Sequence, residues 1–147
     1  MCDYCGCRLS GPTAELAREH AELRALDDAI YDAIRDGRDP TGTFQEFVRL
    51  LEMHAAKEEI GLFVHARGHP ALADQVSALC DDHDDLRSWL AHGPGGPRVL
   101  DALRLLVTHI DDEEYDLFPH VFHQLDPEQW DEIELAHRAV DAAWADG

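Results

Sequence analysis

The sequence has few positive charges and no long apolar run. Lys and Arg total 12 of 147 residues against 31 Asp and Glu, which gives a formal net charge of −19. A surface this acidic repels phosphate backbones, so we expect no nucleic-acid partner. No apolar stretch approaches the roughly 18 residues that a membrane span needs, so we expect no membrane association. The N-terminus lacks the basic start and apolar stretch of a signal peptide, which predicts a cytoplasmic location.

Cysteine is scarce and unevenly placed. Cys2, Cys5 and Cys7 lie within the first seven residues, and Cys80 stands alone. A disulfide framework spaces its cysteines along the chain, so this pattern favours a reducing compartment. The cluster has three open interpretations: a metal or iron–sulfur site that takes one outside ligand, a thiol redox switch, or an ordinary chain terminus. Cys80 is a candidate for the missing fourth ligand.

Strand-like alternation is also missing, and a hydrophobic period near 3.6 dominates the chain. Thr13 and Gly37 suit the two ends of a first helix. The segment 43–46, Thr-Phe-Gln-Glu, has the spacing of a capping box, and Pro119 should end or kink a fourth helix. Asp126 with Pro127 should open a fifth helix. The expected helices therefore cover residues 13–36, 43–67, 71–91, 98–118 and 127–145.

Four helices of about 20 residues with short connections predict an all-α, up-down-up-down antiparallel four-helix bundle. The fifth, C-terminal helix should cover one side or end of that bundle. The length suffices for one domain. We therefore expect a Cys-containing N-terminal segment over residues 1–12 and a single domain over residues 13–147.

An internal repeat carries most of the unusual polar residues. The stretches 54–65 and 109–120 share the pattern HxxxEExxLFxH, with six of twelve positions identical, and the chain holds ten histidines in all. The preceding helices echo each other weakly, in HAELR at 20–24 and HDDLR at 83–87. Two helical hairpins are therefore built on one plan. The first offers His20, His54 and Glu58, and the second offers His83, His109 and Glu113.

The spacing within the repeat points to a metal site. Residues four apart lie on one helix face, about 40° and ~6 Å from each other, so each His and its Glu point the same way. These six residues interrupt otherwise apolar stripes, where an unpaired carboxylate costs several kcal/mol. Two cations, each held by two imidazoles and bridged by both carboxylates, would account for the whole set. A nitrogen-rich dinuclear site in a helical bundle favours iron over manganese.

Two alternatives remain open at this point. Glu59 and Glu114 directly follow the two chosen glutamates, and a slip of one residue in helix phase would make either of them the ligand. A helical bundle with histidines in its core and no metal is the other alternative. The choice of the i+4 glutamates is favoured because it keeps each pair on one face.

The ordered motifs His20, His54-xxx-Glu58, His83 and His109-xxx-Glu113-Glu114-Tyr-Asp-Leu-Phe-Pro resemble the hemerythrin-like (HHE cation-binding) domains, over about residues 13–123. The resemblance implies an antiparallel four-helix bundle with an oxo- or hydroxo-bridged non-haem di-iron centre, that is, two iron ions. Its four-His, two-Glu set looks more like that of the bacterial iron-centre repair proteins and related single-domain members than that of the oxygen-carrying hemerythrins. The metal ligands that the resemblance implies are His20, His54, Glu58, His83, His109 and Glu113.

One departure from the oxygen-carrying hemerythrins bears on function. They have a fifth histidine one turn after the third-helix histidine, where this chain has Arg87, and they use HxxxxD where this chain has HxxxE. The change leaves an open position on one iron, or a place for Tyr115 or Tyr31 as a substitute ligand. Arg87 itself fits equally well as a solvated residue on a helix edge.

An open position favours reaction with O2, peroxide or nitric oxide over quiet storage. The resemblance thus implies a protein that binds or reacts with such a ligand in stress response or detoxification. If it is an enzyme, it is an oxidoreductase. The alternative is an iron or oxygen sensor, or an iron-donating protein without turnover, and a protein partner is not identified by the sequence.

The remaining histidines have less specific interpretations. His65 and His120 fall seven residues after the two glutamates, which places them two turns along the same faces. They suit either a second layer of partners around the metal or simple packing at the helix ends. Lys57, the only lysine, is expected to have no chemical role. Four histidines are expected at the surface: His69, His92, His123 and His137.

Overall fold

The computed structural model describes residues 11–145, and within that range the chain is helical and contains no strand. Two π-helical turns, η1 (Glu58–Leu62) and η2 (Glu113–Leu117), lie within otherwise continuous helices. The all-α prediction is confirmed. The α-helices are α1 (Gly11–Arg35), α2 (Thr41–Lys57), α3 (Phe63–Arg67), α4 (Pro70–Leu90), α5 (Val99–Asp112), α6 (Phe118–Gln124) and α7 (Pro127–Ala145).

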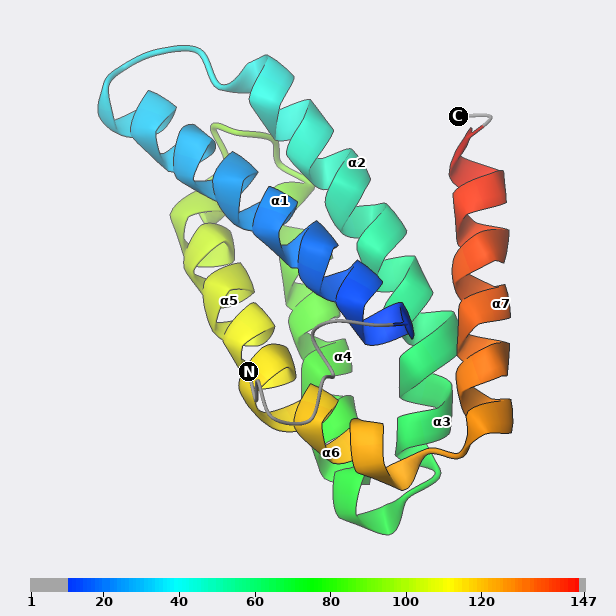
Figure 1. The fold of residues 1–147 in the computed structure, drawn as a ribbon. Helices are drawn as coiled ribbons and strands as arrows, with labels where there is room; N and C mark the ends of the chain where they lie inside the picture. The colour runs from blue at the N-terminus through cyan, green and yellow to red at the C-terminus, as the bar shows by residue number, and fades with distance from the viewer. Residues whose placement is uncertain (1–10, 146–147) are drawn as a thin grey trace.

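Two antiparallel hairpins make up the bundle, as the internal repeat predicts. α1 packs along α2 in the first hairpin, and α4 packs along α5 in the second. The predicted C-terminal helix is α7, which lies against α1, α2 and η1 and runs along the outside of the bundle (Figure 1). None of the helices in residues 11–145 is both long and apolar enough to cross a membrane.

The helix ends agree with the sequence at some positions and differ at others. Gly37 ends α1 with a φ of +71°, a conformation that glycine adopts without strain. Asp126 opens α7 by exchanging two hydrogen bonds with Gln129, at 2.8 and 3.0 Å. The capping box over residues 43–46 is wrong, because α2 already begins at Thr41, whose N–H and hydroxyl both donate to Asp39.

Pro119 does not end its helix. It lies in the first turn of α6, directly after η2, and the helix continues to Gln124. Figure 1 shows α6 turning away from the direction of α5 at this point, which confirms the predicted kink. A π-helical turn already lacks the regular i to i−4 hydrogen bonds, so it accommodates a proline with no N–H to donate.

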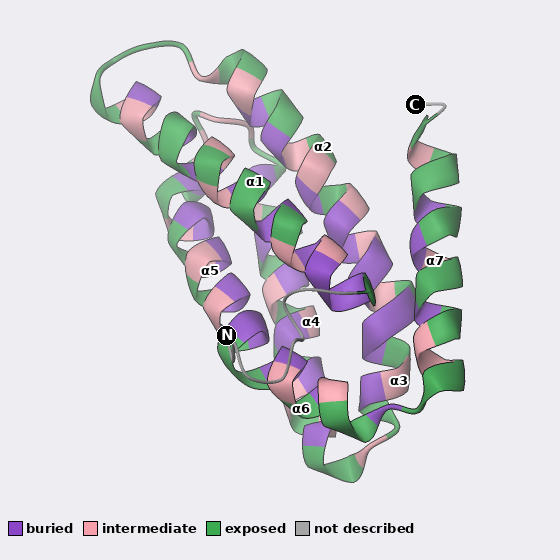
Figure 2. Cartoon of the chain, viewed as in Figure 1, coloured by how far each residue is buried: buried purple, intermediate pink, exposed green. Residues whose placement is uncertain are grey.

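The core is divided into two apolar clusters with a polar layer between them. Along α1, Leu16 belongs to one cluster and Leu23 to the other, with His20 between them. Along α4, Leu79 and Leu86 belong to different clusters in the same way. Buried residues lie on the faces that the helices turn toward one another (Figure 2). The polar layer therefore sits deep in the bundle, closed by apolar packing at both ends.

Candidate metal centre

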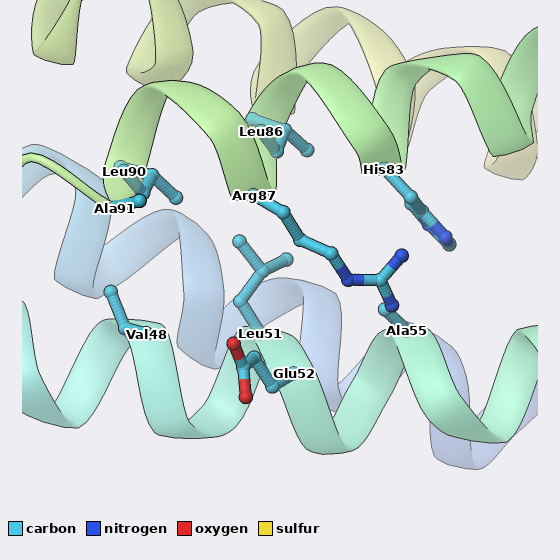
Figure 3. A pocket seen from close by; sticks show the side chains of 9 residues that line it. All are labelled: Val48, Leu51, Glu52, Ala55, His83, Leu86, Arg87, Leu90 and Ala91. Atoms are coloured by element: carbon cyan, nitrogen blue, oxygen red, sulfur yellow. The ribbon is translucent and has the colours of Figure 1, made fainter.

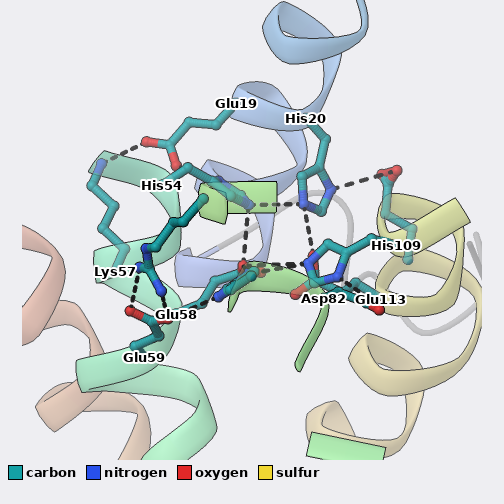
Figure 4. Close-up of polar contacts among 12 residues, drawn as sticks. Glu19, His20, His54, Lys57, Glu58, Glu59, Asp82, His109 and Glu113 are labelled. Atoms are coloured by element: carbon teal, nitrogen blue, oxygen red, sulfur yellow. Dashed lines mark hydrogen bonds and ion pairs between the residues drawn. The ribbon is translucent and has the colours of Figure 1, made fainter. Parts of the chain in front are cut away.

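The structure brings all six predicted ligands together in the polar layer. Each is almost completely buried. The four histidines come from four different long helices, and the two glutamates are the first residues of the π-helical turns. Single π turns inside α-helices occur frequently at functional sites. The six side chains are His20, His54, Glu58, His83, His109 and Glu113. All of them except His83 are labelled in Figure 4.

The imidazoles form two pairs, one from each hairpin. The Nε2 atoms of His20 and His54 are 3.1 Å apart, and those of His83 and His109 are 3.2 Å apart. Two neutral imidazoles meeting nitrogen to nitrogen can share only one hydrogen bond. A metal ion that takes both lone pairs satisfies the two rings at once. Each pair therefore has the arrangement of two ligands of one ion.

Both carboxylates connect the two histidine pairs. Oε1 of Glu58 lies 3.3 Å from Nε2 of His54 and 3.2 Å from Nε2 of His83. Oε1 of Glu113 lies 3.2 Å from Nε2 of His20 and 3.1 Å from Nε2 of His109. A carboxylate that faces both pairs is placed to bridge two ions. Each of the two carboxylates thus contacts one histidine from each hairpin.

The polar atoms of the layer lack the hydrogen bonds that burial normally demands. Neither oxygen of Glu58, nor Oε2 of Glu113, accepts a well-formed hydrogen bond from a residue within 11–145. Unsatisfied buried carboxylate oxygens are costly, and coordination to a cation removes that cost. The potential ligand atoms fall into two groups, and Glu58 belongs to both. Within each group, all of these atoms lie within 4.8 Å of one another. The residues therefore fit metal ions.

The carboxylates and the histidines of the layer also shift each other's pKa values. Burial disfavours the charged imidazole, but the nearby Glu58 carboxylate and the hydrogen bond to Glu19 raise the pKa of His54 to about 10. Burial would raise the pKa of Glu58, yet the histidines, chiefly His54, hold it well below the usual value. The same potential that attracts protons to these rings attracts metal cations.

Carboxylates outside the layer orient the imidazoles from behind. Within each hairpin, the acidic residue just before the first histidine contacts Nδ1 of the second histidine. Glu19 is 2.9 Å from His54, and Asp82 is 3.0 Å from His109. A carboxylate at Nδ1 fixes the tautomer and turns the Nε2 lone pair toward the centre, which is a common support for metal-binding histidines.

Glu59 and Glu114 serve the opposite hairpin in the same way. Oε2 of Glu59 lies 3.0 Å from Nδ1 of His83, and Oε2 of Glu114 lies 3.6 Å from Nδ1 of His20. Each therefore faces the back of an imidazole, while the preceding glutamate faces the centre. This difference supports the i+4 glutamates over the alternative that a slip in helix phase would have produced.

The repeated Leu-Phe pair also supports the site. Phe63 stacks on His83 with ring centroids 5.6 Å apart, and Phe118 stacks on His20 at 5.7 Å. Each phenylalanine thus covers the first histidine of the other hairpin. The rings exclude water and restrict the imidazoles, so the phenylalanine of the repeated motif takes part in building the centre.

Arg87 is exposed at the edge of α4, as the solvated interpretation expected, but its guanidinium is paired. Its guanidinium donates two hydrogen bonds to Glu59, at 2.7 and 2.9 Å. Burial acts to raise the pKa of Glu59, but His83 and Arg87 lower it to about 2. Arg87 and His83 thus both favour the ionised form of the carboxylate that lies behind His83. The two proposed substitute ligands, Tyr31 and Tyr115, are 45% and 65% exposed and lie outside the buried layer.

A cavity of about 120 Å³ opens beside the second histidine pair. His83 and Arg87 line it on one side, and Leu51 and Ala55 of α2 line it on the other. Figure 3 shows the Arg87 side chain extending between α4 and α2 beside His83. The cavity therefore lies where a fifth histidine, one turn after His83, would reach into the site.

His65 and His120 do not stay on the inward face. His65 contacts Glu132 of α7 at 3.1 Å, and His120 is exposed and contacts Asp116 at 3.2 Å. The seven-residue spacing assumed a regular α-helix. A π-helical turn contains more residues per turn, so η1 and η2 rotate both histidines away from the centre.

Two further expectations about polar residues are wrong. His137 is buried and its Nδ1 lies 3.0 Å from Glu15, because α7 packs against the bundle. Lys57 is buried among three carboxylates. The sequence offered a weak signal for the burial of Lys57, because this basic residue directly precedes Glu58 in a helix with an apolar face. It offered no such signal for His137. Cys2, Cys5 and Cys7 lie outside the described residues.

Asp27 is a buried acid that no sequence motif marks. It lies in a groove between α1 and α5, with Asp28, Tyr31 and Arg104 also in the lining. Its Oδ2 has no hydrogen-bond partner among the described residues. Burial, together with the Asp28 charge, raises the pKa of Asp27 to about 7, although Arg24 opposes the shift.

Asp27→Asn should stabilise the protein at alkaline pH. The carboxyl ionises near its ordinary pKa of 3.8 in the unfolded chain but near 7 in the folded one. Wild-type stability should therefore fall as pH rises through this window and level off above it. Thermal unfolding should show Asp27→Asn more stable by about 1–2 kcal/mol at pH 8 and unchanged at pH 3.5. Glu22→Gln, on the exposed face of α1, is the control, and an equal gain at both pH values contradicts the prediction.

Four buried histidines, two shared carboxylates and the helical hairpins that carry them define a cation-binding four-helix bundle. The chain belongs to the hemerythrin family: the model of the hemerythrin HHE cation binding domain matches residues 11–121. No curated protein and no solved structure matches the chain. The match ends before α7, so this helix lies outside the part of the chain that defines the family.

Proposed function

We propose that the six buried side chains hold two iron ions, and that this non-haem di-iron centre binds or reacts with O2, peroxide or nitric oxide. The observation that carries the proposal is the position of the carboxylates. Oε1 of Glu58 and Oε1 of Glu113 each lie within 3.3 Å of a histidine from both hairpins. Two adjacent ions satisfy all of these contacts, and one ion does not.

The donor set favours iron. Four imidazole nitrogens with bridging carboxylates suit iron, and di-iron centres occur in the cores of helical bundles. A structural zinc site would take four ligands around one ion and leave the remaining groups of the layer unsatisfied. Iron at such a site supplies redox chemistry and electrophilic sites for small ligands.

The chain's own residues orient ligands and limit access. Glu19, Glu59 and Asp82 hold imidazoles in the tautomer that presents Nε2 to the centre. The two apolar clusters exclude bulk water above and below the layer. The cavity beside His83 is small and mostly apolar, which suits a diatomic molecule or peroxide and excludes larger substrates.

Arg87 in place of a further histidine supports reactivity over reversible oxygen carriage. The guanidinium is bound to Glu59 and lines the cavity, so this helix position supplies no ligand. The His83–His109 half then has two imidazoles and the two shared carboxylates, as the other half does, and the cavity beside His83 offers a place there for an exogenous molecule. The proposed reaction class is an oxidoreductase that consumes peroxide or nitric oxide.

Metal analysis of the purified full-length protein tests the centre. We expect about two irons per chain, with near-ultraviolet charge-transfer absorption. His109→Ala should reduce the content to about one iron or less, because it removes one of the two imidazoles of a pair. His123→Ala changes an exposed histidine and serves as the matched control. Zinc as the resident metal, or two irons retained in His109→Ala, would contradict the proposal.

Turnover tests the reactivity separately. Mixing the iron-loaded protein with peroxide and following O2 release, and with nitric oxide and following its loss, should give rates above those of free iron at equal concentration. Rates equal to free iron for both molecules would remove the enzymatic proposal and leave the binding one. The alternative of a sensor or iron donor depends on Cys2, Cys5 and Cys7, which lie outside the described residues, and it stays a prediction.

A further inference from the structure

Lys57 occupies a buried position between the metal layer and α7. It is only 1% exposed. Its Nζ lies 2.6 Å from Glu15 and 2.5 Å from Glu19, both on α1, and 2.8 Å from Asp141 on α7. A lysine buried this deeply requires compensating charges, and here it receives three. Lys57 therefore connects three helices at one point, one residue before Glu58.

The connection continues into the metal layer through Glu19. One oxygen of Glu19 contacts Nζ of Lys57, and the other contacts Nδ1 of His54 at 2.9 Å (Figure 4). With both oxygens engaged, the carboxylate has a single orientation. A continuous chain of contacts thus runs from Asp141 through Lys57 and Glu19 to the imidazole of His54.

Further contacts hold α7 against the same side of the bundle. Nδ1 of His137 lies 3.0 Å from Glu15, which also contacts Lys57. Near the C-terminal end of α7, Arg49 of α2 donates a hydrogen bond of 2.6 Å to the carbonyl of Trp144. The docking of α7 and the orientation of Glu19 therefore depend on shared residues.

The His83–His109 half has a related chain of contacts, Arg87–Glu59–His83, but neither Arg87 nor Glu59 forms an ion pair with a residue of α7 among the described residues. The repeat places the exposed Asp112 where the first hairpin has Lys57. Asp82 takes the role of Glu19 at His109, but no Lys or Arg within residues 11–145 forms an ion pair with it. The two halves of the layer share the same pattern of inner ligands. They differ in the charged residues that lie behind the imidazoles, on the Nδ1 side.

We propose that Lys57 is a positioning residue that couples the docking of α7 to the His20–His54 half of the centre. Through Glu19 it orients His54, and through Asp141 it makes this orientation depend on α7. Two consequences follow. The two metal positions are inequivalent, and a displacement of α7 loosens the metal at His20 and His54 and leaves the metal at His83 and His109 in place. The inference rests on the proposed dinuclear centre.

Release of iron to a chelator tests the coupling in the full-length, iron-loaded protein. Lys57→Met removes the charge and keeps the chain length, and it should speed release of one iron per chain by about tenfold, in the range for lost partners of metal-binding histidines. Asp141→Ala removes a contact that is one step further from His54 than Lys57 is, and its position is exposed. The variant should therefore fold normally and speed the release of the same iron a few-fold. Glu134→Ala, which removes an exposed acid paired with Arg138 on the same helix, is the matched control.

Mössbauer spectra of the same samples identify the affected site. We expect two iron signals in wild type, with only one of them changed in Lys57→Met and Asp141→Ala. Release and spectra of Asp141→Ala equal to those of Glu134→Ala would overturn the proposal, and so would equal changes at both irons. If Lys57→Met fails to fold, Asp141→Ala decides. If wild type carries another metal, the proposed function fails, and release of that metal from the same variants still tests the coupling.

Discussion

Glu58→Ala should bind at most about one iron per chain. The carboxylate faces histidines of both hairpins, at 3.3 Å from His54 and 3.2 Å from His83, so its loss would remove a ligand from both ions of the proposed centre. Loss of an outer partner of a metal ligand already costs ~10–100-fold in affinity, and a bridging ligand should cost more. Metal content after dialysis, measured together with the near-ultraviolet absorption, checks the result.

The metal-free form of Glu58→Ala should also be less stable than metal-free wild type. Without a cation, Glu58 is a completely buried carboxylate whose counter-charge comes from the histidines, chiefly His54, which hold its pKa well below the usual value. Its removal leaves that buried positive charge unpaired and should lower the melting temperature of the metal-free protein by a few degrees at neutral pH, at about 2–4 °C per kcal/mol for a domain of this size. Glu46→Ala, on the exposed face of α2, should change neither property. Two irons retained in Glu58→Ala would refute the bridging assignment.

Phe118→Ala should have a large effect on folding stability. The ring is fully buried in one apolar cluster and stacks on His20 at 5.7 Å with planes 5° apart. Truncation of a buried phenylalanine costs about 3–5 kcal/mol, which corresponds to a fall of about 10 °C or more in melting temperature. Thermal unfolding of the iron-loaded protein measures the effect.

The neighbouring Phe122 supplies the control. Its ring is only partly buried and contacts His123 edge-on, outside the metal layer. Phe122→Ala should therefore lower the melting temperature much less than Phe118→Ala. Phe63→Ala, at the equivalent position of the repeat, should resemble Phe118→Ala, because that ring covers His83 in the same manner. Equal melting temperatures for Phe118→Ala and Phe122→Ala would exclude a supporting role for the ring.

The paired roles of the repeat explain why the centre has an internal symmetry. Glu59 of the first hairpin contacts His83 of the second, and Glu114 of the second contacts His20 of the first. Phe63 crosses between the hairpins in the same sense. Neither hairpin therefore completes its own half of the site. The repeat becomes functional only when the two hairpins pack together.

The sequence by itself determined the helices and the inner layer. Periodicity near 3.6 places polar residues on apolar stripes, and the i, i+4 spacing of His54 with Glu58 is a local property of one helix. Such properties depend only on neighbours along the chain. The duplicated pattern placed the six polar residues on the inward apolar stripes of four helices, and the packing of those helices brings the six side chains together.

Local periodicity does not determine where a helix changes its pitch or what packs behind a ligand. The π-helical turns rotate His65 and His120 off the inward face, although seven residues of α-helix would have kept them there. The partner of each Nδ1 atom comes from another helix, so no spacing rule identifies it. These features were decided by tertiary packing, which alone brings side chains of different helices into contact.

Lys57 shows most clearly the difference between what the local sequence determines and what tertiary packing decides. In the sequence it is a single basic residue before Glu58, and it was expected to have no role. Burial between α1 and α7 turns it into the shared partner of Glu15, Glu19 and Asp141. The local sequence determined the metal-binding pattern, because that pattern lies along single helices. Only the tertiary structure decided which charges support it, because those charges lie up to 122 residues apart in the chain, as between Glu15 and His137.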